Sequence, residues 1–318
     1  MDLIYADAQR VDLGVLKDYK FDLAYGVSEN DFEIKVNTSN HVCRENYFIY
    51  ADHTEYGGII DSIEVDTESK EVSYKGRTFH GILDKKIISP NSGADYYTVN
   101  GDANTIIAGL ITRYDLSSLF KASADTSVNI SNYKFNRYVS VYEGLRKMLA
   151  EVGYKLMMSY EDGYVVLSAE PIAVYGEDDG LDSDQVSFLI QKTYNPVNHL
   201  ICLGQGELRN RTVIHLYLND KSEVVTTQYY TGLREVVEVF DYPNAESSDE
   251  LRQRGKERLT DQDTNNVEVT LNNSYNFDIG DKITANDIIT GLQVTRTINK
   301  KIVTIKNDVV KIDYSVGD

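Results

Sequence analysis

The chain has no tryptophan, only two cysteines and four prolines in 318 residues, and no long apolar run. Without Trp it lacks the side chain that usually forms stacking platforms in sugar-processing clefts. Cys43 and Cys202 stand far apart in sequence, so we expect two reduced thiols rather than a disulfide framework. No apolar stretch approaches the length of a membrane span, so we expect no membrane partner.

Basic side chains are also scarce. The chain carries 32 Lys and Arg against 50 Asp and Glu, a formal net charge of −18. This balance disfavours binding to phosphate backbones and to anionic membranes. The first ten residues, MDLIYADAQR, lack the basic-then-apolar order of a signal peptide, so we expect synthesis and folding in a cytoplasm. The length suggests about two domains.

Signatures of metal and cofactor binding are missing from the sequence. The five histidines are scattered, and no H-E-x-x-H motif or Cys/His pairing for zinc occurs. The run Asp261, Asp263 and Asn265 imitates the start of a calcium loop. However, Asn266 stands where the loop needs Gly, and Asn272 where it needs a bidentate Glu. We therefore expect no metal and no cofactor.

Sequence signatures of catalysis are also missing. Ser118 and Lys121 match S-x-x-K, but no K-T-G follows, and there is no P-loop, G-x-G-x-x-G or G-x-S-x-G. A carboxylate pair for glycoside hydrolysis stays open as an alternative, because 50 acidic residues offer many candidates and the sequence favours none. We name no catalytic residue and expect no enzyme.

Tyrosine is abundant, with 24 Tyr against 9 Phe. Tyr combines an apolar ring with a polar tip, which suits half-buried surfaces between subunits. The alternative is the compositional bias of an A·T-rich genome, and the two readings stay open.

The segment Glu55–Ile88 is the most informative part of the chain. Its period-2 pattern predicts two strands joined by the polar stretch Asp66–Lys70, then an Arg-bearing turn and a further strand. Gly57 and Gly58 precede the first strand, and Gly76 follows the second. At these glycines we expect either a positive φ or a close approach of backbone.

The fold class predicted is mainly β (α+β), with two small related β-barrel modules and an α/β insert between them. Short strands fill residues 1–99, the N-terminal barrel, and residues 100–175 form the insert. Asp102 and Ser140 are expected to cap two helices, and a hairpin turns at 161–163.

The remaining residues are divided into a β region at 176–244 and a polar helix with a C-terminal β-barrel at 245–318. The acidic run Gly176–Asp184 is predicted to be a solvated loop, and Ser247 to cap a mostly exposed helix that ends near Thr260. Gly280 and Asp281 are expected in a tight turn before a last hairpin. Glycine-led hairpins at both ends of the chain hint at an internal duplication.

Several of these patterns together resemble the baseplate hub and tail-tip proteins of phage tails, in particular the Gp-thirty-seven-like siphovirus tail proteins. The matching stretches occur in this order: SENDFEIKV (28–36), EYGGIIDSI (55–63), YKGRTFHGILDKKIISP (74–90), YYTVNGDANTIIAGLI (96–111) and FDIGDKI with TGLQVTRTINKKIVTI (277–305).

This resemblance implies a structural protein of a bacteriophage or of a phage tail-like bacteriocin, without catalytic residues. It implies a homotrimeric ring that joins the hexameric tail tube, or a distal tail protein, to the central spike, tip or tape-measure protein. DNA would be passing cargo, and the virion tail baseplate the location. The residues carried over as interface or structural positions are Tyr56, Gly57, Gly58, Gly76, Arg77, Gly280 and Asp281. The alternatives are a tail-associated cell-wall hydrolase and a carbohydrate-binding receptor module.

Overall fold

The computed structural model describes residues 1–176, 186–192, 196–261, 265–271, 276–287, 292–306 and 309–317. The backbone alone is described at 186–192, 265–271, 285–287 and 292–294. Most of the predicted acidic loop therefore lies outside the described residues, as do Asp263 and Asn272 of the calcium-like run. Two compact units result, one of residues 1–188 with 268–318 and one of residues 189–267.

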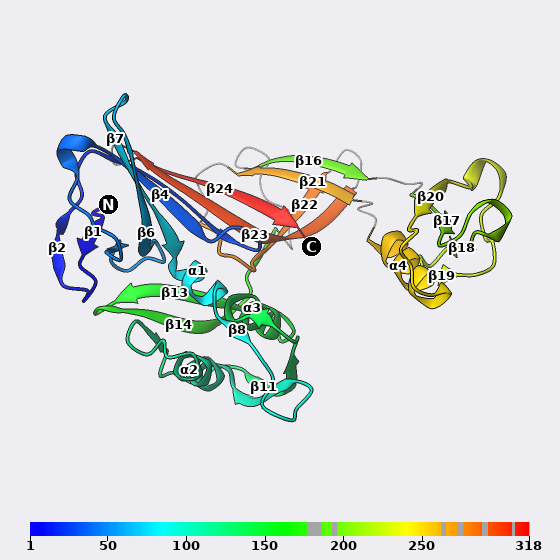
Figure 1. The fold of residues 1–318 in the computed structure, drawn as a ribbon, viewed down its shortest axis with the longest axis horizontal. Helices are drawn as coiled ribbons and strands as arrows, with labels where there is room; N and C mark the ends of the chain where they lie inside the picture. Colours follow the sequence, from blue (N-terminus) through cyan, green and yellow to red (C-terminus); the bar gives the residue numbers. More distant parts are fainter. Residues whose placement is uncertain are drawn as a thin grey trace. The chain divides into compact units, whose positions relative to one another are not determined.

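The first unit is built around one sheet of eleven strands (Figure 1). The order along the sheet is β15-β22-β23-β3-β4-β7-β6-β5-β1-β2, and β24 pairs with β23. The strands are β1 (Ile4–Ala6), β2 (Asp12–Val15), β3 (Tyr19–Gly26), β4 (Asp31–Asn37), β5 (Phe48–Tyr50), β6 (Gly57–Asp66), β7 (Glu71–Thr78), β15 (Val174–Tyr175), β22 (Lys282–Asp287), β23 (Leu292–Lys306) and β24 (Val309–Gly317).

The two ends of the chain meet in this sheet, because β23 pairs antiparallel with β3 from Lys300 opposite Gly26 to Lys306 opposite Lys20. The mainly β fold is confirmed. The expectation of two separate small barrels is corrected, since first and last β segments share one sheet and one core. That core joins Phe21, Ile34 and Tyr74 to Phe277 and Val303.

The predicted hairpin at 59–74 is confirmed as β6 and β7, which pair from Gly58 opposite Thr78 to Asp66 opposite Glu71. The further strand expected in this segment is present only as the short strand β8 (Ile87–Ile88), and the residues before it, Phe79–Asp84, form the unpredicted helix α1. Thr78 caps this helix by accepting a hydrogen bond from the Gly81 amide at 3.1 Å. Phe79 and Leu83 are fully buried, so tertiary packing holds the short helix in place.

The insert follows as β8 (Ile87–Ile88), β9 (Tyr97–Asp102), α2 (Ala103–Arg113), β10 (Phe120–Ala122), β11 (Asn129–Phe135), β12 (Val139–Ser140), α3 (Val141–Ala150), β13 (Tyr154–Glu161) and β14 (Tyr164–Pro171). Both predicted caps are present. Asp102 accepts from the Thr105 amide at 3.0 Å, and Ser140 accepts from the Glu143 amide at 3.1 Å. The helices and strands of the insert pack around one apolar core, to which α1 also contributes buried side chains.

The second unit contains a four-stranded sheet in the order β19-β18-β17-β20. Its elements are β17 (His199–Leu203), β18 (Val213–Leu218), β19 (Val224–Val225), β20 (Val237–Asp241) and helix α4 (Ser248–Thr260). Two further strands, β16 (Val186–Lys192) and β21 (Asn265–Leu271), pair with each other. Short 3-10 turns lie at Thr38–Asn40, Leu208–Asn210 and Gly232–Arg234.

Helix α4 begins at the predicted Ser247 cap and ends at Thr260. Leu251, Gly255 and Leu259 are its buried residues. A Cβ added at Gly255 would lie 2.5 Å from the Cys202 sulfur, so the helix packs tightly on β17. This grouping differs from the expected one, which placed the helix with the C-terminal strands.

Candidate functional site

Three of the glycines singled out in the sequence lie where β5, β6 and β7 come into close contact. A Cβ added at Gly76 would lie 1.9 Å from the Ile59 carbonyl oxygen, and one at Gly58 would lie 2.0 Å from the Arg77 oxygen. Gly57 is closest to the Ile49 carbonyl oxygen, at 2.5 Å. None of the three has a positive φ, so close backbone approach, not turn geometry, requires glycine here.

Arg77 is anchored on the same sheet by a fork of hydrogen bonds to Asp61. Its Nε lies 2.8 Å from Oδ2 and its Nη2 lies 2.7 Å from Oδ1 of Asp61, and its amide donates to Oδ2 at 3.0 Å. Asp61 stands at the irregularity where the register of β6 against β7 shifts between Ile60 and Ser62. The hydrogen bonds from Arg77 lower the pKa of the Asp61 carboxyl. Arg77 therefore fixes the local shape of the sheet.

Tyr56 lies beside a buried ion pair that sequence reasoning missed. Lys301, only 1% exposed, places its Nζ 2.9 Å from Oε1 of Glu55 and 5.8 Å from the centre of the Tyr56 ring. The Tyr25 hydroxyl donates to the same carboxylate, and His80 Nε2 lies 3.5 Å from Oε2. The cluster thus joins β3, α1 and β23 around one carboxylate.

The electrostatics of this cluster follow from burial and pairing. Burial opposes the ionisation of Glu55, but Lys301 and the hydrogen bonds of its neighbours prevail and lower the pKa of this carboxyl to about 2. Burial lowers the pKa of His80 despite the nearby Glu55. Burial raises the pKa of Tyr25 well above its ordinary value. The resting state is therefore an ionised Glu55–Lys301 pair with neutral His80 and Tyr25.

Gly280 and Asp281 form the predicted tight turn and contribute to a second buried cluster. The amide of Asp281 donates to the Asp278 carbonyl at 3.1 Å, and Gly280 has a φ of +102°. The fully buried Asp281 carboxylate accepts from Lys155 Nζ at 2.7 Å and from the Ala173 amide at 3.0 Å. Lys155 also binds Asp278 at 2.8 Å. This cluster ties β13 of the insert to the turn before β22.

The residues carried over from the resemblance thus fall into two places. Tyr56, Gly57, Gly58, Gly76 and Arg77 gather around β6 and β7, while Gly280 and Asp281 lie at the turn before β22. One sequence signal could have revealed part of the first cluster: Lys301 shares the inward face of β23 with Val303 and Ile305. A lysine at such a position needs a buried partner.

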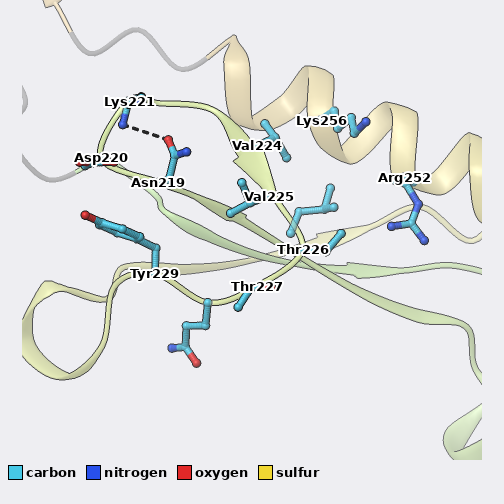
Figure 2. A pocket seen from close by; sticks show the side chains of 12 residues that line it. Asn219, Asp220, Lys221, Val224, Val225, Thr226, Thr227, Tyr229, Arg252 and Lys256 are labelled. Atoms are coloured by element: carbon cyan, nitrogen blue, oxygen red, sulfur yellow. Dashed lines mark hydrogen bonds between the residues drawn. The ribbon is translucent and has the colours of Figure 1, made fainter.

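The second unit holds an open pocket of about 740 Å³ between the β18–β19 turn and helix α4 (Figure 2). Asn219, Asp220 and Lys221 line one side and Arg252 and Lys256 the other. Among its lining residues only Asp220 is acidic and none is His or Cys, so the pocket has no carboxylate pair.

A pair of histidines lies on the same sheet. His199 Nδ1 is 2.7 Å from Oε1 of Glu235, and its Nε2 is 2.8 Å from Nδ1 of His215. Across the described ranges, no group of three or more His, Cys, Asp or Glu residues is arranged to hold a metal ion. In the same ranges, no helix is both long and apolar enough to cross a membrane.

Comparisons with known proteins agree with this architecture at the level of fold. No protein family matches the chain by sequence, and no curated protein matches it. Among solved structures, the 43 kDa tail protein of prophage MuSo2 from Shewanella oneidensis aligns with a TM-score of 0.51 at 13% identity, covering 99% of this chain and 98% of that one.

Two further neighbours come from the same class of protein. The tail protein from Neisseria meningitidis MC58 aligns over 100% of this chain and 96% of its own with a TM-score of 0.49 at 13% identity. A chain of the phage P2 baseplate aligns over 100% and 99% with a TM-score of 0.47 at 10% identity. The structural neighbours of the chain are therefore phage tail proteins and a phage baseplate, and the fold of the chain is similar to that of a phage tail protein.

Proposed function

We propose that this chain is a non-enzymatic structural hub of a phage tail or phage tail-like particle. In this proposal three copies form a ring that joins the hexameric tail tube, or a distal tail protein, to the central spike, tip or tape-measure protein. The observation that carries it is the end-to-end similarity to the MuSo2 tail protein, which covers 99% of this chain and 98% of that one. This similarity extends over nearly the whole of both chains, which supports a role of the same kind for the fold as a whole.

The buried polar groups support a scaffold role. Each buried charge in the two clusters is paired with an opposite one: Lys301 with Glu55, and Lys155 with Asp281. Such groups join distant parts of the chain, which is what a rigid assembly part requires. Two separate barrels per chain cannot support the proposed ring, since both ends of the chain share one sheet. The support for the ring is the fold similarity and the general tendency of such parts to form closed symmetric rings.

The net charge of −18 suggests a further property of such a ring. A channel lined by acidic side chains repels phosphate, so DNA would pass through without binding. The electrostatic potential of the channel wall in an assembled ring tests this point. A neutral or basic wall would contradict it.

The test of the non-enzymatic reading is the turnover of purified cell wall and the binding of glycans by the isolated chain. A structural hub gives no soluble cell-wall fragments and no saturable glycan binding. Release of fragments would favour the hydrolase alternative, and saturable binding would favour the receptor alternative.

A further inference from the structure

A groove of about 710 Å³ lies between α3, β13 and the turn before β22. Apolar side chains and basic side chains share its lining. The apolar ones are Val27, Leu156, Ile172, Val174 and Ile279, and the basic ones are Arg146, Lys147, Lys155 and Lys282. On a chain with a net charge of −18, a groove with four basic residues and the single acidic residue Glu143 is unusual.

Two of these four cations are already neutralised. Lys155 is paired with Asp278 and Asp281, and Lys147 lies 2.6 Å from Glu143. Arg146 and Lys282 form no ion pair with any residue that the structure describes. The groove therefore offers an apolar floor and two cations for a ligand with apolar and acidic groups.

The tip of the β6–β7 hairpin has the matching chemistry. Within Glu64–Glu71 four residues are acidic and only Lys70 is basic, and Val65 is 55% exposed. Glu64 pairs with Lys75, and Asp66 holds the turn by accepting from the amides of Glu68 and Ser69 at 2.8 and 3.1 Å. Glu68 and Glu71 have no ion-pair partner among the described residues. The tip is thus a preshaped arm with two uncommitted carboxylates.

Figure 1 shows this hairpin extending past the end of the large sheet, well away from α3 in the same unit. An arm and a groove at separate places on one chain cannot meet within that chain, but they fit a head-to-tail contact between two copies. Such heterologous contacts close into rings when the rotation between copies permits.

We propose that the β6–β7 hairpin tip of one copy docks into the groove beside α3 of the next copy. Glu68 and Glu71 would face Arg146 and Lys282, and Val65 would cover the apolar floor. This inference rests on the proposed ring and names the contact that closes it.

Sedimentation of the purified full-length chain over a range of concentrations tests the contact. We expect the double variants Glu68→Lys/Glu71→Lys and Arg146→Glu/Lys282→Glu each to raise the dissociation constant for self-association by at least about tenfold, because like charges then face each other. Glu45→Lys is the matched control: it is an exposed acidic residue outside the hairpin tip and the groove, and it should leave self-association unchanged.

The chain that combines all four reversals separates this contact from misfolding. It again places opposite charges face to face, so self-association should return toward that of the wild-type chain. Wild-type-like assembly of both double variants would overturn the docking contact and leave the proposed ring standing. A wild-type chain that stays monomeric at every concentration would also overturn the contact, and the hub proposal would then be judged by its place in the particle.

Discussion

The ammonium of Lys301 lies 2.9 Å from the carboxylate of Glu55 across a separation of 246 residues. Their side chains are 2% and 15% exposed, so both charges have largely left water. Lys301 stands on the strand that joins the C-terminal part of the chain to β3, and Glu55 stands just before β6. The pair therefore holds together the two halves of the large sheet.

Removing one partner of this pair should destabilise the fold strongly. Lys301→Met keeps most of the side-chain volume but leaves Glu55 as a buried, uncompensated charge, a change that costs about 3–5 kcal/mol. Lys300→Met is the matched control on the neighbouring residue. Its partner Glu29 is 51% exposed, so the loss should stay within about 1 kcal/mol. Urea unfolding of both variants measures the difference, and equal losses would contradict the account.

The close contact at Gly76 predicts that alanine destabilises the fold at this position but not at Gly109. Gly76→Ala would bring a Cβ to within 1.9 Å of a backbone oxygen, so β6 and β7 must shift apart. We expect a loss of about 1–3 kcal/mol in the free energy of unfolding, or more. Gly109→Ala, in α2 with no heavy atom within 4 Å of the new Cβ, should instead stabilise by up to about 1 kcal/mol. Thermal unfolding tests both, and a stable Gly76→Ala variant would refute the close approach.

The low pKa of Glu55 predicts acid sensitivity. Its ordinary pKa is 4.5, and the folded protein lowers it to about 2. The unfolded chain therefore takes up a proton first as the pH falls. The stabilisation is fully present above about pH 4.5 and is lost as the pH drops towards 2, on the order of 3 kcal/mol in total. Neutral His80 acts in the same direction, because burial lowers its pKa below the ordinary 6.5.

The measurement is the free energy of unfolding as a function of pH for the wild-type chain and Glu55→Gln. The variant should be less stable at neutral pH and lose less stability between pH 4.5 and 2. Parallel pH profiles for the two chains would show that folding does not lower the pKa of Glu55.

Both cysteines are free and fully buried, as the sequence predicted for reduced thiols. Burial raises the pKa of Cys43 to about 12 and that of Cys202 to about 11. Because the thiolate is the reactive form, neither should react with a thiol reagent in the folded protein, and both should react after unfolding in urea. Rapid modification of either thiol under native conditions would contradict the burial described here.

Local signals in the sequence predicted the elements well. Asp102, Ser140 and Ser247 cap their helices as expected, since capping depends on residues only a few positions apart. Helix α1 was missed because packing of Phe79 and Leu83, rather than periodicity, decides its conformation. The pairing of β23 with β3 was missed as well, because register between distant strands leaves no local trace.

In the candidate site, too, features set by neighbouring residues were predictable and features set by distant contacts were not. Close backbone approach at Gly58 and Gly76 was one of the two expectations for these glycines, although the sequence placed them outside the strands and the structure places them within β6 and β7. The turn at Gly280 was predictable from its neighbours. The partners Lys301 and Lys155 come from distant segments, so no spacing in the sequence could connect them with Glu55 or Asp281. Long-range ion pairs become visible only when the chain is folded.

The central claim, a structural ring at the end of a tail tube, is tested most directly by electron microscopy of purified tail particles that carry a tag on this chain. The account predicts three copies in one ring at the distal end of the tube. Absence of the chain from the particle, or a copy number and position incompatible with a threefold ring, would contradict it.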